Sequence, residues 1–139
     1  MERHLIYWPL LAQVLIPISV LMLMGKRKSR DVRTGDFDRE KAAIDNEAWS
    51  LPVVLTSKNL ANQFQMPVIF YVLCLVLASL DAVDLLTLGV AWLFVITRIV
   101  HAYIHVSTNY VPNRFRAFLL SVLLLLVLLG LTVRALAGV

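Results

Sequence analysis

The chain has 139 residues, of which 60% are hydrophobic and 16% charged, and its net charge is +4. Its mean hydropathy of +0.79 lies far above the range of soluble globular domains, so we exclude a soluble fold and expect an integral membrane protein. A chain of this length cannot hold two sizeable domains, and its single cysteine, Cys74, excludes an internal disulfide and a metal site built on thiolates. We therefore expect one membrane domain over residues 1–139.

The first apolar segment covers residues 5–25, which is enough for a bilayer-spanning helix of ~20 residues. It lacks the small-residue cleavage pattern of a signal peptide and runs directly into the basic sequence KRKSR, so we expect a retained helix. Pro9 and Pro17 predict a bend or local irregularity within it.

Residues 26–50 form the only extended hydrophilic stretch, and its basic side chains crowd against the end of the first helix. The positive-inside rule therefore predicts a cytoplasmic loop, with the N-terminus on the other side of the membrane, and we expect the cell inner membrane as its location. We expect a solvated connector whose basic end also contacts anionic head groups. Because the basic residues are few and interleaved with acidic ones, nothing here supports nucleic-acid binding.

Three further helices are expected over residues 51–80, 83–105 and 114–135. Ser50 is a suitable N-cap for the first of these, and prolines stand near the start of the first and the last. The short acidic turn DAVD makes the middle two antiparallel neighbours. Four crossings place both termini outside, with Arg114 inside, which agrees with the charge of the first loop. The predicted fold class is an all-α, four-helix membrane bundle.

Arg98, His101 and His105 lie too deep for ordinary interfacial residues. Residues 85–97 cover only about 20 Å at ~1.5 Å per residue, short of the ~30 Å hydrocarbon core, so the helix cannot finish crossing before Arg98. The three side chains have i, i+3, i+7 spacing and therefore share one helix face.

Asn59, Asn62 and Gln63, together with Met66, form a second stripe on one face of the preceding helix. Because the two helices are antiparallel neighbours, the stripes occur at similar depth and can meet. Charged groups in a bilayer cost at least ~2.5–3.5 kcal/mol on insertion scales, so they normally face a protein interior or a wet cavity. We infer a polar cavity open to the cytoplasm, with Arg114 at its mouth and Lys58 beside it. No acidic residue falls within these segments, so the cavity favours a ligand with carboxylate or phosphate oxygens. Such a ligand is a small polyanionic or zwitterionic molecule, or a lipid head group.

Other roles are open for several of these residues. Lys58 can extend to the head groups, the Asn and Gln side chains can join helices to one another, and His105 can be structural. His101 and His105 are spaced for a metal but lack an acidic third ligand, so we expect no metal site.

The sequences KNLANQFQMPVIFY and TRIVHAYIHVSTNYVPNRFR resemble the MAPEG family, membrane-associated proteins in eicosanoid and glutathione metabolism. The resemblance implies a homotrimer of four-helix subunits that binds glutathione between adjacent subunits near the cytoplasmic face and activates its thiol with an arginine. By position, Arg98 and His101 resemble glutathione contacts, and Arg114 resembles the arginine that stabilises the thiolate. Asn59 matches an asparagine of the second helix, and Lys58 stands where catalytic members usually have arginine.

Two positions depart from the family pattern. Catalytic members carry a glutamate three residues after the asparagine, which holds the amino group of glutathione; here the residue is Asn62, or Gln63 or Gln65 in a shifted alignment. The third-helix tyrosine is replaced by His105, although Tyr103 and Tyr110 are near in sequence. Loss of the glutamate removes a charge-assisted bond worth about 1.5–3 kcal/mol.

Two functions follow from these residues. The first is a glutathione-dependent transferase or peroxidase for lipophilic substrates, in which Arg114 lowers the thiol pKa. The alternative is a non-catalytic protein that binds an anionic lipid head group or metabolite in the same cavity. Retention of the cationic positions favours the first, and the missing glutamate favours the second. The sequence leaves open whether the cavity lies within one subunit or between subunits.

Overall fold

A computed structural model describes residues 2–138, and its secondary structure is helical. Four segments are long and apolar enough to cross a membrane, which confirms the predicted all-α membrane fold. In chain order the elements are η1 (Arg3–Ile6), α1 (Tyr7–Thr34), η2 (Asn46–Ala48), α2 (Leu51–Gln63), α3 (Met66–Ser79), α4 (Leu85–Val106) and α5 (Val111–Ala137).

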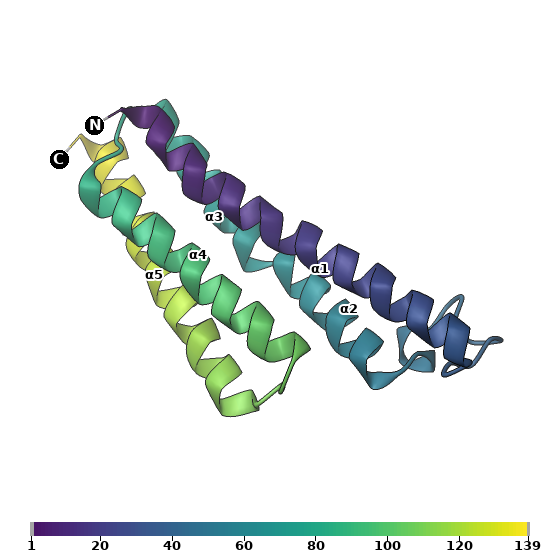
Figure 1. Cartoon of the computed structure of the whole chain (residues 1–139). Coiled ribbons are helices and arrows are strands. Elements are labelled where there is room, and N and C mark those ends of the chain that lie inside the picture. The colour runs from purple at the N-terminus through teal and green to yellow at the C-terminus, as the bar shows by residue number, and fades with distance from the viewer. Residues whose placement is uncertain (1, 139) are drawn as a thin grey trace.

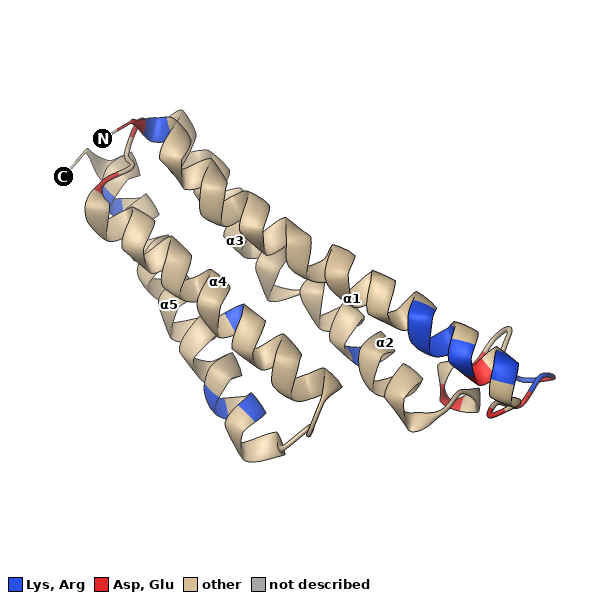
Figure 2. Cartoon of the chain, viewed as in Figure 1, with Lys and Arg blue, Asp and Glu red and all other residues tan. Residues whose placement is uncertain are grey.

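The helices run along one another as an elongated bundle. In Figure 1, α1 lies along α2 and α3, and α4 pairs with α5, while both ends of the chain lie at the same end of the bundle. Lysine and arginine collect at the opposite end, near the loop after α1 and the start of α5 (Figure 2). Four crossings with an uneven charge distribution are what the sequence predicts.

Apolar side chains both fill the bundle and cover its outside. Phe70 of α3 stacks on Phe94 of α4 with ring centroids 4.4 Å apart, at the centre of a buried apolar cluster. Large aliphatic residues on the outer faces, such as Leu75 and Leu126, are more than half exposed. An apolar exterior of this extent suits lipid and not water, because a soluble fold would expose a contiguous aggregation-prone surface.

The first helix is longer than predicted. α1 continues through residues 26–34 and ends where Gly35 adopts a left-handed conformation with φ 72°, a common helix C-cap. The helix also continues without a break through Pro17, so the irregularity expected there does not interrupt it. The basic residues at its end are thus carried on a rigid helix that projects beyond the apolar segment.

The predicted second helix is divided in two. α2 ends at Gln63 and α3 begins at Met66, and Gln65 between them has φ −101° and ψ −100°, outside the helical region. Pro67 explains the break, because it has no N–H to bond the carbonyl four residues back and its ring clashes with that carbonyl in a continuous helix. That carbonyl belongs to Gln63.

The segment between α1 and α2 is mostly exposed, as expected of a solvated connector, but it is also folded back against α1. The buried carboxylate of Asp31 accepts a hydrogen bond from the Ser50 amide at 3.1 Å. Phe37 stacks on Trp49 with centroids 4.9 Å apart, and the Lys28 ammonium lies 4.7 Å from the Trp49 ring centroid. These contacts return the chain to α1 just before α2 starts.

Arg27 joins three helices at this end of the bundle. Its Nη1 donates to the Pro52 carbonyl at 3.0 Å and to Thr56 Oγ1 at 2.7 Å, and its Nη2 donates to the Val106 carbonyl at 2.8 Å. α1 is therefore fastened both to α2 and to the C-terminal end of α4, whose last carbonyls need donors from outside the helix. The sequence indicated only the charge of Arg27.

Candidate ligand-binding pocket

The two predicted polar stripes meet between α2 and α4. Asn59 Nδ2 donates to the Ala102 carbonyl at 3.0 Å, and Gln63 Nε2 donates to Asn59 Oδ1 at 2.7 Å. Asn62 Nδ2 lies 3.5 Å from the Nδ1 atom of His105. Asn59 thus makes an interhelical polar contact of the kind that is common in membrane bundles, and Gln63 supports it from within α2.

Arg98 is buried, as its position along the helix predicts. Its side chain is 1% exposed, and Nε and Nη2 have neither solvent contact nor a hydrogen-bond partner within residues 2–138. It lies about one helical turn deeper than His101 on the same face of α4. A guanidinium remains charged in proteins, and an unpaired buried charge is costly, so this group has unused capacity for a negative partner.

His101 connects α4 to α5. Its Nδ1 lies 3.2 Å from the Arg114 carbonyl, while its Nε2 is buried without a hydrogen-bond partner in the described chain. The ring of His105 stands almost perpendicular to that of His101, with centroids 5.9 Å apart. The first contact fixes the orientation of the His101 ring and leaves one ring nitrogen free for another group.

A pocket of about 480 Å³ lies between α2, α4 and α5 within the single chain. It includes five of the predicted site residues, and Asn59 and Arg98 are buried outside its lining. One part of the wall is basic and polar, another is aliphatic and aromatic, and the nine lining residues that the structure describes include no acidic one. They are Lys58, Ala61, Asn62, His101, His105, Val111, Arg114, Phe115 and Phe118.

The cations at the pocket have partners that the sequence did not indicate. We expected no carboxylate near Lys58, but its Nζ lies 3.7 Å from Glu47 Oε1, because the folded loop returns over the start of α2. Arg114 Nη1 donates to Asn109 Oδ1, from the turn between α4 and α5. Asn109 itself has φ 51°, a left-handed conformation that asparagine tolerates better than most residues.

The aromatic part of the wall was also missed. Val111, Arg114, Phe115 and Phe118 follow i, i+3, i+4, i+7 spacing and therefore form one face of α5. This spacing is visible in the sequence, but it merges with the long apolar run that follows. The pocket consequently has an apolar side that a purely anion-binding site does not need.

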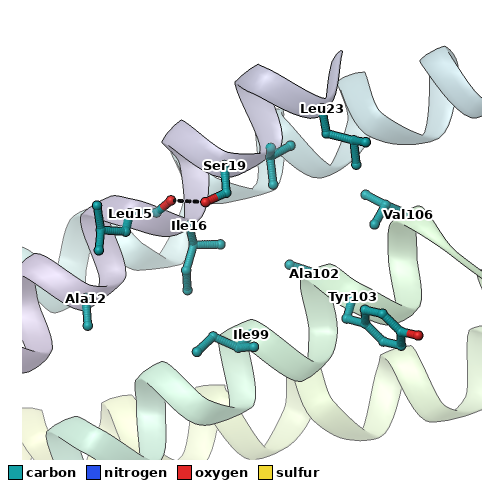
Figure 3. Close-up of a pocket in the computed structure, with 10 residues that line it drawn as sticks. Ala12, Leu15, Ile16, Ser19, Leu23, Ile99, Ala102, Tyr103 and Val106 are labelled. Carbon is teal, nitrogen blue, oxygen red and sulfur yellow. Dashed lines mark hydrogen bonds between the residues drawn. The ribbon is translucent and has the colours of Figure 1, made fainter. Parts of the chain in front are cut away.

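Tyr103 and Tyr110, the two tyrosines near His105 in sequence, do not line this pocket. Tyr103 is 71% exposed and borders a separate groove of about 440 Å³ between α1 and α4 (Figure 3). The groove is almost entirely apolar, and the Ser19 hydroxyl in its wall donates to the Leu15 carbonyl at 2.8 Å. It suits an acyl chain better than an anion. Of Tyr103, Tyr110 and His105, only His105 lines the pocket between α2, α4 and α5.

The fold and the pocket define an integral membrane protein with four membrane-spanning segments and a basic cavity near one end of the bundle. The sequence matches the MAPEG family over residues 5–134, nearly the whole chain, and the protein belongs to that family. Comparisons with curated proteins and with solved structures gave no significant match.

Proposed function

We propose that the protein binds glutathione in the pocket between α2, α4 and α5 and uses its thiolate against lipophilic electrophiles. The observation that supports this proposal is the combination of basic and aromatic walls in a single pocket of a membrane bundle. Glutathione carries two carboxylates and an ionisable thiol, and the basic wall with Lys58 and Arg114 complements these anionic groups. The apolar part of the pocket wall, with Phe115 and Phe118, suits an apolar co-substrate that arrives from the bilayer.

Arg114 has the central chemical role in this proposal. A guanidinium beside the thiol lowers the thiol pKa and raises the fraction of thiolate, which is the nucleophile. In a substitution, the thiolate sulfur forms a bond to the electrophilic carbon and the leaving group departs with the electron pair of the broken bond. The thiol proton passes to water, and the product is a thioether. A hydroperoxide substrate would instead be reduced to an alcohol and water as two glutathiones form a disulfide.

The absorbance of the thiolate tests this role. Purified protein mixed with glutathione is expected to give a thiolate band that Arg114→Ala loses. Arg116→Ala is the matched control, because Arg116 is two residues away in α5 but does not line this pocket. Absence of the band in the wild type, or an equal band in Arg114→Ala, contradicts the proposal.

A second candidate function is the non-catalytic binding of an anionic lipid head group or metabolite. The neutral side chain of Asn62 favours it, because the resemblance places a glutamate there in catalytic members. Native mass spectrometry of the detergent-extracted protein distinguishes the two functions. A bound anionic lipid that glutathione does not displace supports this candidate, and displacement by glutathione supports the first.

We also propose a homotrimer in the cell inner membrane, with the loop after α1 on the cytoplasmic side. The family resemblance supports the trimer, and the concentration of basic residues at the loop end supports the orientation (Figure 2). Native mass spectrometry of delipidated protein is expected to give three times the chain mass of 15.7 kDa. A monomer or dimer under mild detergent conditions contradicts the trimer.

A further inference from the structure

The folded loop places one carboxylate beside a pocket whose own described lining carries none. Glu47 Oε1 lies 3.7 Å from the Nζ atom of Lys58, and Lys58 lines the pocket. Neither α2 nor α4 nor α5 contains an aspartate or glutamate. The loop therefore supplies the carboxylate, Glu47, that forms an ion pair with the lining residue Lys58 at the edge of the pocket.

Glu47 is held at this place from both sides. Its amide donates to Asp45 Oδ1 at 2.8 Å, which starts the short helix η2. The amide of Asp38 donates to the Ala48 carbonyl at 2.9 Å, and Trp49 Nε1 donates to the Ala42 carbonyl at 3.3 Å. The backbone that carries Glu47 is thus fixed by several contacts, so its side chain projects from an ordered segment.

The pair with Lys58 does not by itself account for this arrangement. Both side chains are well exposed, 61% for Lys58 and 74% for Glu47, and exposed ion pairs contribute little to stability. A carboxylate has room for about four hydrogen bonds, so one contact at 3.7 Å leaves most of its capacity free. Glu47 can therefore bind a second cationic group without leaving Lys58.

We infer that Glu47 binds the ammonium group of an amphoteric ligand whose anionic groups face Lys58 and Arg114. The ligand class is a molecule that carries at least one acidic group and one free amine. Its identity as glutathione rests on the proposed function, whereas the requirement for an ammonium group rests on Glu47. The same carboxylate disfavours anions that lack an amine, because like charges beside each other oppose binding.

Calorimetric titration with glutathione and N-acetylglutathione tests this assignment. The wild type is expected to bind glutathione at least about tenfold more tightly than N-acetylglutathione, which is the effect of one charge-assisted hydrogen bond. Glu47→Gln is expected to lose that preference, chiefly through weaker binding of glutathione. Glu40→Gln, which removes the same charge from another exposed loop position, is expected to keep it.

A second ligand pair separates failure of this assignment from failure of the proposed function. Lysophosphatidylethanolamine and lysophosphatidic acid differ in the presence of an ammonium group. If glutathione does not bind but the wild type prefers the ethanolamine lipid and Glu47→Gln does not, the proposed function fails and the role of Glu47 stands. The role is overturned if Glu47→Gln retains the preference, if the wild type shows none, or if it binds neither pair.

Discussion

Arg98 shows how far the depth of a residue can be predicted from sequence. Counting residues along α4 places its side chain below the membrane surface, and the structure confirms that it is buried. Its missing partners were equally predictable, because α2, α4 and α5 contain no acidic residue. That Arg98 lies outside the pocket wall was not predictable, because it shares a helix face with His101 and His105, which do line the wall.

Replacing Arg98 with methionine is expected to stabilise the ligand-free protein by about 1–3 kcal/mol, because it removes an unpaired buried charge and keeps most of the side-chain volume. The same variant is expected to lose part of the stabilisation that glutathione gives the wild type, because the charge of Arg98 lies about one helical turn from His101 in the pocket wall and attracts an anionic ligand. Thermal unfolding in detergent with and without glutathione measures both effects. A less stable variant that retains the full ligand shift would show that Arg98 serves the fold and not the ligand.

Arg27 should have the opposite effect on stability. Arg27→Met removes three hydrogen bonds and leaves the carbonyls of Pro52 and Val106 without this donor, so a loss of at least about 2 kcal/mol is expected. Thermal unfolding beside Arg33→Met, an exposed position on the same helix, checks the result. Equal unfolding midpoints for the two variants would mean that the Arg27 contacts contribute nothing.

At the scale of elements, local signals and long-range contacts differ in how well they can be predicted. Pro67 in the sequence is enough to indicate the division between α2 and α3, and Gly35 marks the true end of α1; both signals were overlooked beside the strong apolar pattern. The folded loop is different. Asp31 and Ser50 are 19 residues apart, and no periodic pattern relates them.

The start of α4 provides a pH-dependent contact. Asp84 Oδ1 accepts a hydrogen bond from the Thr87 amide at 2.7 Å, and this bond, with a smaller contribution from Arg134, lowers the pKa of Asp84 below its ordinary value of 3.8. A lowered carboxyl pKa stabilises the fold above the ordinary value, and the contribution is lost as pH falls through the lowered pKa.

Asp84→Ala is therefore expected to cost about 1 kcal/mol at neutral pH, as for other N-cap losses. The difference from wild type should shrink as the pH falls below 3.8 and through the lowered pKa. Unfolding midpoints of both proteins across this range provide the measurement. A difference that stays constant down to the lowest pH would exclude the charge of Asp84 as its source.

At the scale of the whole molecule, composition and helix length were enough to predict a four-crossing bundle, and the MAPEG match over residues 5–134 agrees with that fold. The polar pocket was predicted from helix faces alone, including its basic residues. Its apolar wall and the approach of Glu47 were not, because they depend on α5 and on the folded loop.

The orientation in the membrane can be tested on the intact chain. The segment between α1 and α2 carries exposed Arg39 and Lys41, so trypsin is expected to cut there in inverted membrane vesicles and not in right-side-out ones. Mass spectrometry of the fragments identifies the cut. Cleavage of this segment only in right-side-out vesicles would reverse the proposed orientation.

The most direct test of the account is an experimental structure of the purified protein at saturating glutathione. Density for the tripeptide is expected between α2, α4 and α5, with its sulfur beside Arg114 and its amine beside Glu47. An empty pocket at saturation, or glutathione bound at a site that shares none of these residues, would contradict the account.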